Sequence, residues 1–245
     1  TALNDGNIAI RITAFDAAGN TSKEEVFVAA AVFIKDAGIP NTPSVPDLDA
    51  ADDSGASSSD DITNQTTLLT FSGTSDPFDS IQLYDSTTQV GLPVVATVGG
   101  LWSIDLALAE GTYQINAKAT DAGLNESLAS GNLTVVIDET VPAVPSLATI
   151  VSGAGWATDY ITVSNQTAVK VSGSKSTDTV SVQIDIDDED TFAAAKTRTL
   201  SGLGSGLTYA DATGIDVTTV TALNDGNIAI RITAFDAAGN TSKEE

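Results

Sequence analysis

The chain has 245 residues, and its 33 Asp and Glu against 10 Lys and Arg give a net charge of −23. This charge argues against nucleic acid and anionic lipid as partners, because both are themselves anionic. The sequence has no Cys and no His, which excludes disulfides, cysteine-ligated zinc and a Ser-His-Asp triad, and no apolar run approaches the roughly 18 residues that would predict membrane insertion.

A repeat organises the chain. Thr1 to Glu25 recur letter for letter as Thr221 to Glu245. Within the repeat, Ile8, Ile10 and Ile12 alternate with smaller or polar residues and predict a half-buried strand. Residues 16–20, Asp-Ala-Ala-Gly-Asn, then predict a loop rich in oxygen ligands, and a diverged third copy lies at residues 108–125. We expect an array of one module, cut within a module, so that the chain is a fragment of a longer array.

Two proline-containing linkers divide the array. Residues 36–43 and 138–145 each begin with Asp and carry two prolines at the same spacing, which is typical of stiff linkers. We therefore predict that residues 1–36 are the C-terminal strands of a preceding module. Residues 37–140 are predicted to form a complete module, and residues 141–245 a module that lacks its last strand.

Short strand patterns separated by turn signals continue through both modules. In the middle module we predict a short first strand before an acidic loop at 47–61, and further strands at 67–72, 80–84, 94–98, 102–106, 113–120 and 133–137. In the last module we predict them at 159–163, 168–172, 179–187, 196–200, 215–220 and 228–235, and the missing seventh strand corresponds to 26–34. About seven short strands in about 100 residues favour an all-β fold of tandem immunoglobulin-like β-sandwich modules in an extended rod. Tyr113 lies where such sandwiches carry a tyrosine corner.

Acidic loops converge at the linkers. Loops alternate between the two ends of an antiparallel sandwich, so residues 121–125 are expected beside Asp36, and the loop 52–61 beside Asp138. Two carboxylates at about 4 Å repel by about 1 to 4 kcal/mol, and carboxylate, Asn and backbone oxygens suit calcium. The predicted calcium ligands are Asp16, Asn20, Asp36, Asp52, Asp53, Asp60, Asp61, Asp121, Asn125, Asp138, Glu139, Asp236 and Asn240. The alternative is that these residues only serve their turns.

A second acidic run is interpreted as structural. It comprises Asp185, Asp187, Asp188 and Asp190. The run lacks the Gly at the sixth position of an EF-hand loop, and Lys196 stands at the twelfth.

Several motifs together resemble a known family. They are 60–66 (Asp-Asp-Ile-Thr-Asn-Gln-Thr), 100–103 (Gly-Leu-Trp-Ser), 120–123 (Thr-Asp-Ala-Gly), 137–142 (Ile-Asp-Glu-Thr-Val-Pro) and 235–242 (Phe-Asp-Ala-Ala-Gly-Asn-Thr-Ser). In order and spacing they resemble the bacterial immunoglobulin-like repeats of giant biofilm-associated and RTX-type surface adhesins. The resemblance covers nearly the whole chain. It implies an extracellular stalk on the bacterial cell surface, rigidified by calcium at the junctions, with neighbouring modules of the same chain as partners. The loop Gly153 to Tyr160 departs from the pattern, because it is short and has one acid.

Two other functions are considered. A carbohydrate- or protein-binding module would use Trp102 or Trp156 as a stacking platform, although Trp102 alternates with Ile104 and Leu106, which favours core packing. An enzyme without His or Cys would need paired carboxylates. The acids lie in loops without an aromatic cleft, so we predict no enzymatic activity and no catalytic residue.

The ends of the chain predict self-association. The last module has a sixth strand without a seventh, whereas residues 26–34 form an apolar strand without a module. We therefore expect head-to-tail contacts, in which the N-terminal segment of one molecule completes the C-terminal module of the next.

Overall fold

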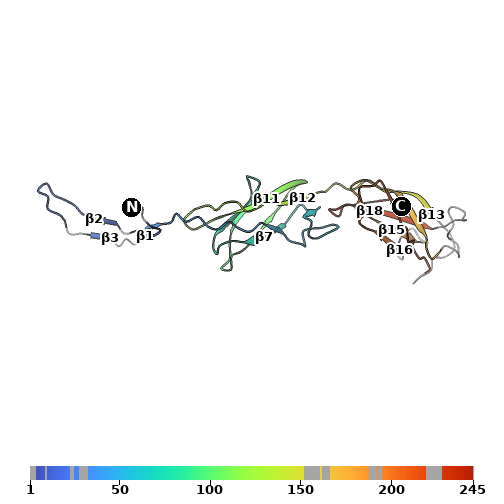
Figure 1. The fold of residues 1–245 in the computed structure, drawn as a ribbon, viewed down its shortest axis with the longest axis horizontal. Helices are drawn as coiled ribbons and strands as arrows, with labels where there is room; N and C mark the ends of the chain where they lie inside the picture. The colour runs from blue at the N-terminus through green and yellow to red at the C-terminus, as the bar shows by residue number, and fades with distance from the viewer. Residues whose placement is uncertain are drawn as a thin grey trace. The chain divides into compact units, whose positions relative to one another are not determined.

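The computed structural model describes residues 4–8, 10–22, 25–27, 33–151, 161, 166–187, 192, 195–218 and 228–244. Their regular secondary structure is β-strand (Figure 1), so the all-β prediction is confirmed. Among these residues no helix has the length and apolar character needed to cross a membrane. The chain divides into two compact units. The first comprises residues 1–47, 71–105 and 114–133, and the second comprises 48–70, 106–113 and 134–245.

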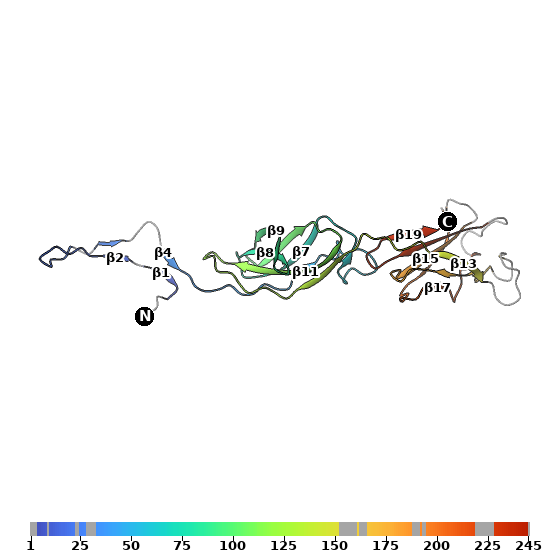
Figure 2. The same ribbon diagram turned by 90° about the horizontal axis from the view of Figure 1, so that it is seen from above.

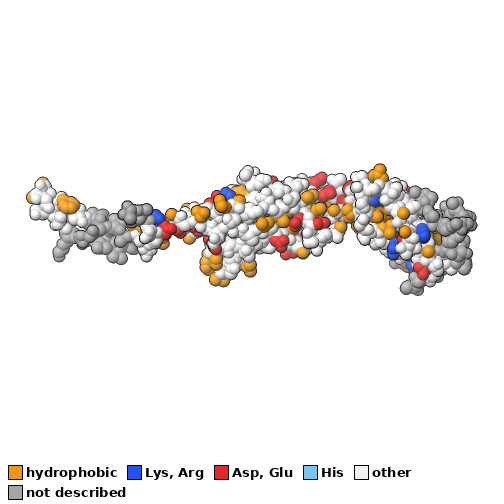
Figure 3. Space-filling view, viewed as in Figure 1, with side chains coloured by type: hydrophobic (Ala, Val, Ile, Leu, Met, Phe, Trp, Pro, Cys, Tyr) orange, Lys and Arg blue, Asp and Glu red, His pale blue; other side chains and the backbone are white. Residues whose placement is uncertain are grey.

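The middle module contains two sheets, with strand orders β10-β7-β5 and β6-β12-β11-β8-β9. Figure 2 shows β7, β8, β9 and β11 within it. The strands are β5 (Asp47–Leu48), β6 (Ile62–Thr63), β7 (Leu69–Thr74), β8 (Ser80–Asp85), β9 (Thr88–Val95), β10 (Leu101–Leu106), β11 (Gly111–Thr120) and β12 (Leu133–Ile137). Strand β12 pairs parallel to β6, and β11 pairs antiparallel to β8. Figure 3 shows acidic side chains in red on the surface of this module.

The alternation of apolar and other side chains along residues 101–106 explains why they form strand β10. Its residues are exposed and buried in turn, with Trp102, Ile104 and Leu106 each 4% exposed, because successive side chains of a strand point to opposite faces. The prediction that Trp102 packs in the core is confirmed. The tyrosine corner is confirmed as well, since Tyr113 Oη donates to the Ala109 carbonyl oxygen at 2.9 Å.

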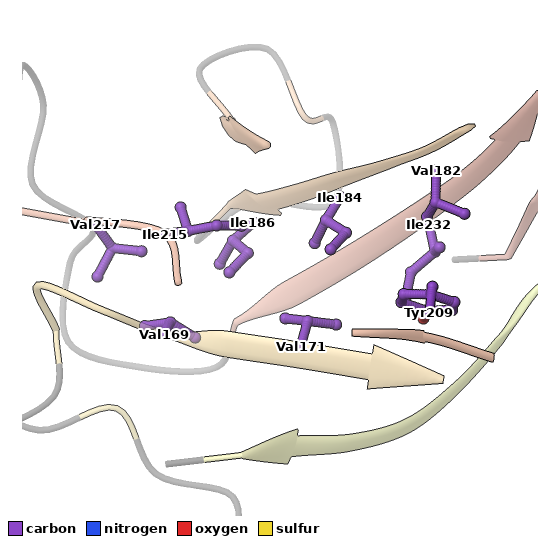
Figure 4. Packing of buried hydrophobic residues seen from close by; sticks show 9 residues of the cluster. All are labelled: Val169, Val171, Val182, Ile184, Ile186, Tyr209, Ile215, Val217 and Ile232. Atoms are coloured by element: carbon purple, nitrogen blue, oxygen red, sulfur yellow. The ribbon is translucent and has the colours of Figure 1, made fainter. Parts of the chain in front are cut away.

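The last module contains sheets of order β13-β14-β17 and β16-β15-β18-β19. Its strands are β13 (Ser146–Val151), β14 (Lys170–Ser174), β15 (Ser181–Asp187), β16 (Lys196–Leu200), β17 (Thr208–Ala210), β18 (Ala229–Phe235) and β19 (Thr241–Glu244). Branched apolar side chains and one tyrosine, from the strands and from the segments beside them, make its core (Figure 4): Val169, Val171, Val182, Ile184, Ile186, Tyr209, Ile215, Val217 and Ile232.

Several strands differ from the prediction. Strand β9 starts at Thr88 instead of residue 94, because Gly91 and Pro93, which indicate a turn in the sequence, are tolerated in a strand at a sheet edge. Strands β5, β6, β13, β17 and β19 are not predicted at their residues, and β19 (Thr-Ser-Lys-Glu) has no apolar residue to reveal it. The predicted strands 159–163 and 215–220 lie partly outside the described residues, as do Trp156 and the loop 153–160 entirely.

Asp185 belongs to a cross-strand ion pair. It lies opposite Arg231 in the β15–β18 register. The Arg231 guanidinium donates to Asp185 Oδ2 from Nε at 3.1 Å and from Nη2 at 2.9 Å, and Thr197 Oγ1 donates to Oδ1 at 2.7 Å. The structural interpretation of the acidic run therefore holds at Asp185, whereas Asp188 and Asp190 lie outside the described residues.

The N-terminal segment contains two strand pairs. Strand β1 (Gly6–Ile8) pairs antiparallel with β4 (Phe33–Lys35), and β2 (Ile10–Ile12) with β3 (Glu25–Phe27). The predicted strand 26–34 is thus seen as its two ends, since residues 28–32 lie outside the described part of the chain.

Candidate functional site

All three copies of the loop that runs from Asp to Asn are closed by the same pair of hydrogen bonds. Asn240 N donates to Asp236 Oδ1 at 2.9 Å, and Asn240 Nδ2 donates to Asp236 Oδ2 at 3.0 Å. The same two bonds link Asn20 to Asp16 and Asn125 to Asp121. The residue before each Asn has a positive φ, for example 91° at Gly239.

In these loops the aspartate carboxylate accepts hydrogen bonds from within the same turn. Hydrogen bonds from the Asn125 side chain and then from its backbone amide lower the pKa of Asp121, and those from Asn20 lower the pKa of Asp16 in the same way. Each carboxylate therefore serves its turn. A carboxylate has about four lone-pair positions, so these bonds leave capacity for a further ligand.

The third loop packs against the first loop of the middle module. The Ala56 amide donates to the Ala237 carbonyl oxygen at 3.0 Å, and Ser54 Oγ donates to the Ala238 carbonyl oxygen at 3.0 Å. All of these residues belong to the second compact unit. We call residues 54–56, Asn64, Asp138 and 236–240 the joint.

Asn240 is the central side chain of the joint. It is 8% exposed. Besides its bond to Asp236, its Nδ2 donates to the Asp138 carbonyl oxygen at 2.7 Å, and its Oδ1 accepts from Asn64 Nδ2 at 3.2 Å. Both side-chain donors and the acceptor of this amide are therefore used. The amide connects its own loop, the linker and the middle module.

Two glycines allow the backbones of the loops 54–56 and 236–240 to approach each other closely. A Cβ on Gly55 would lie 2.1 Å from the Ala237 carbonyl oxygen, and one on Gly239 would lie 2.9 Å from the Gly55 Cα. Any larger residue at Gly55 would force the loops apart. Gly19, the equivalent of Gly239 in the first copy, has no described atom within 4 Å of such a Cβ.

The acidic first loop folds around Asp53. This residue is 4% exposed, and its Oδ2 accepts from the backbone amides of Asp60 at 3.1 Å and Asp61 at 3.2 Å. Asp52 Oδ2 accepts from the Thr70 amide at 2.8 Å. Asp53 Oδ1 is buried without a hydrogen-bond partner among the described residues. An unsatisfied buried group costs about 1–3 kcal/mol, and more when it is charged.

The other linker lies in the first compact unit. Asp36 Oδ1 accepts from the Gly38 amide at 3.2 Å. A Cβ on Gly123 would lie 2.8 Å from Asp36 Oδ2, so the Asp36 carboxylate lies against the loop 121–125, as the loop order predicts.

The predicted acids do not gather into one carboxylate cluster. Asp138 Oδ1 accepts from the Thr140 amide at 2.9 Å, Asp60 Oδ1 accepts from the Ile62 amide at 3.3 Å, and Glu139 is exposed. Across the described ranges, no group of three or more acidic side chains is placed to hold a metal ion. A calcium site here would have to include Asn and backbone oxygens, which calcium accepts.

Sequence reasoning missed Ser54, Gly55 and Asn64 as functional residues. Their roles depend on which loop lies opposite, and no local pattern encodes that. The Asn64-Gln65-Thr66 triplet is part of the family-like motif, which was the one available signal.

Residues 39–139 match the family model described as bacterial Ig-like domain. The middle module is a bacterial Ig-like domain. The matched residues lie within the predicted module 37–140. No curated protein matches the chain in sequence.

Among solved structures, the chain is similar to a tetra-tandem repeat in the extending region of a large adhesion protein, with 20% identity and a TM-score of 0.33. The similarity covers 99% of this chain and 56% of that chain. It is also similar to fibronectin(III)-like modules of Clostridium thermocellum CbhA, with 14% identity and a TM-score of 0.43 over 82% and 90% of the two chains. A biofilm-associated protein domain gives 15% identity and a TM-score of 0.27 over 83% and 28%. Because these identities and TM-scores are low, the family match alone identifies the module.

The repeat supplies a matched test of the joint. Asn240→Ala removes the bonds to Asp138 and Asn64 together with the bond to Asp236, whereas Asn20→Ala removes only the equivalent of the last. At about 0.5–1.5 kcal/mol per bond, we expect Asn240→Ala to lower the free energy of unfolding by about 1–3 kcal/mol more than Asn20→Ala in urea denaturation. Equal effects of the two substitutions would show that the bonds of the joint contribute nothing to the free energy of unfolding.

Proposed function

We propose that this chain is a structural extender segment of a bacterial cell-surface adhesin, exposed outside the cell, where it supports adhesion and biofilm formation. The observation that carries the proposal is the joint at Asn240, where one buried amide connects a loop, a linker and the preceding module. A chain that only needed independent modules would have no use for such a contact. A stalk needs successive modules held in one orientation.

The side chains that would serve other functions are engaged elsewhere. Trp102 is 4% exposed, so it offers no platform for stacking a sugar. The carboxylates of Asp121, Asp185 and Asp236 are bonded within turns or across strands. These features support a structural role without catalysis over a carbohydrate- or protein-binding role.

We also propose that calcium stiffens the linkers. At one linker the ligands would come from Asp36 and Asp121. At the other they would come from Asp138 or Glu139, the loop 52–61 and Asp236. Asp53 Oδ1, buried without a partner among the described residues, supports this proposal, because a cation would satisfy that oxygen. The affinity should be weak, about 0.1–1 mM, as in extracellular modules.

Small-angle scattering of the full chain in saturating calcium and in EGTA tests both parts. We expect the maximum dimension to be larger in calcium and smaller in Asn240→Ala than in Asn20→Ala, because only the first variant loosens the joint. Asp53→Asn should reduce the response to calcium. If Asn240→Ala and Asn20→Ala give the same scattering profile, the joint does not set the orientation of successive modules. If the wild-type chain gives the same scattering profile in calcium and in EGTA, the calcium proposal is wrong. That result would not affect the proposal about the joint.

We further propose that the N-terminal segment of one molecule pairs with β18 of another. Among the described residues, strand β19 pairs with Ile232–Phe235 and not with the start of β18, which leaves the start of β18 available as an edge. In the N-terminal segment, Phe15 is 70% exposed and Ile34 is 67% exposed. Residues 1–25 have the sequence of the β18 region itself, so the segment that follows them, 26–34, is suited to that edge.

Deleting residues 1–36 tests this contact. We expect the full chain to associate with increasing concentration in analytical sedimentation and the shortened chain to remain monomeric. A full chain that stays monomeric at high concentration would contradict the proposal.

A further inference from the structure

Two loops occupy corresponding positions in the middle and last modules. Ser75 directly follows β7, and its amide donates to the Gly100 carbonyl oxygen at 2.8 Å. Lys175 directly follows β14, and its amide donates to the Leu207 carbonyl oxygen at 2.9 Å. Ser75 and Lys175 therefore stand at the same structural position. The second loop is one residue longer, since β8 begins at Ser80 and β15 at Ser181.

In the last module this position carries a buried ammonium. Lys175 is 5% exposed. Its Nζ donates to the carbonyl oxygens of Ser176 at 3.1 Å, Thr179 at 3.0 Å and Gly204 at 2.7 Å. The three donors of an ammonium are thus all directed at backbone oxygens. Lysine is rarely buried without compensation, and here the carbonyls supply it, as they would for a small inorganic cation.

The middle module lacks that ammonium but keeps one of its acceptors. Ser75 Oγ donates to the Asp76 carbonyl oxygen at 3.1 Å, just as Lys175 Nζ donates to the Ser176 carbonyl oxygen. The hydroxyls of Ser176 and Thr179 are hydrogen-bonded at 2.8 Å. Four residues beyond Ser75, where the last module has Thr179, the middle module has Asp79. Two carboxylates, Asp76 and Asp79, therefore replace two hydroxyls.

Asp79 carries an uncompensated buried carboxylate. It is 6% exposed, and its Oδ2 is buried without a hydrogen-bond partner among the described residues. Burial, and then the charges of Asp76 and Asp121, raise the pKa of Asp79. Asp76 is held in place by the backbone amide of Asn41 at 3.0 Å and by its Nδ2 at 3.1 Å.

The middle module offers little positive charge to neutralise this pair. Residues 37–140 contain fifteen Asp and Glu and a single basic residue, Lys118. Lys118 Nζ donates to Glu126 Oε2 at 2.8 Å and lies 5.3 Å from the centre of the Tyr84 ring, so it is already paired.

We propose that the loop Ser75–Asp79 binds a divalent cation from solution, which takes the place that the Lys175 ammonium takes in the next module. Asp79 Oδ2, the Asp76 carboxylate and backbone oxygens are its ligands. These are hard oxygen donors, which favour calcium or magnesium over zinc or copper. The proposal does not depend on calcium at the linkers.

The two modules therefore differ in their need for cations. The middle module requires a cation from solution to neutralise its loop, whereas the last module has a permanent positive charge there. A chain of such modules would respond to loss of divalent cations at the acidic loops only.

Hydrogen exchange of the full chain, resolved by peptide, tests this difference. With CaCl2 or MgCl2 at about ten times its Kd, mass action predicts about tenfold slower exchange in residues 75–85 than in EGTA. Residues 175–187 should not change. Asp79→Asn, which is isosteric, should abolish the gain in residues 75–85, and Ser75→Lys should slow their exchange in EGTA.

Two controls separate this site from others. Lys175→Ser should speed exchange in residues 175–187 and leave residues 75–85 unchanged. Asp36→Asn removes a proposed linker ligand and should leave the cation response of residues 75–85 intact. The proposal is overturned if divalent cations do not protect residues 75–85, if the protection survives Asp79→Asn, or if Asp36→Asn abolishes it.

Discussion

The side-chain amide of Asn240 is the constraint on which the arrangement of the second compact unit depends. Its donors reach Asp236 and the Asp138 carbonyl, and its acceptor receives Asn64. Among the described residues, the identical sequence at Asn20 makes the bonds within its own loop and no others, and Asn20 is exposed. The loop therefore forms from local chemistry, whereas its docking depends on the partner loop. The same loop sequence thus closes in the same way at Asn20 and at Asn240, and the loop 54–56, Asn64 and the linker add the contacts of the joint.

Charge explains much of the remaining architecture. The last module carries basic groups beside its buried acids, since Asp185 pairs with Arg231 and Asp211 has Arg198 Nε 3.7 Å from its Oδ1, although Asp211 Oδ2 is buried without a hydrogen-bond partner among the described residues. The ammonium of Lys175 is surrounded by carbonyls. The middle module has one basic residue and leaves oxygens of Asp53 and Asp79 buried without partners in the described chain. Burying an isolated carboxylate is expensive, so this module is the part of the chain whose stability should depend most on cations.

The sequence predicts the elements that follow from local periodicity. Strand β10 shows the alternation of Trp102, Ile104 and Leu106, and the position of Tyr113 predicts the tyrosine corner. Loop order also places Asp36 beside residues 121–125. Contacts that join distant loops are not predictable in this way, because Ser54 and Asn64 carry no periodic signal. Lys175 was missed because a single Lys among Ser and Gly indicates an exposed loop, and its burial appears only once the carbonyls around it are placed. Likewise, Asp76 and Asp79 are ordinary turn residues in the sequence, and only burial distinguishes Asp79.

The docking of the loop 236–240 on the middle module is tested most directly by the exchange rate of one amide. Ala56 is exposed, and its N–H donates to the Ala237 carbonyl oxygen at 3.0 Å. Residue-resolved hydrogen exchange by NMR on the full chain should find this amide protected, with the protection lost in Gly55→Ala, whose Cβ would meet that carbonyl. An Ala56 amide that exchanges at the rate of an unstructured peptide in the wild-type chain would contradict the account.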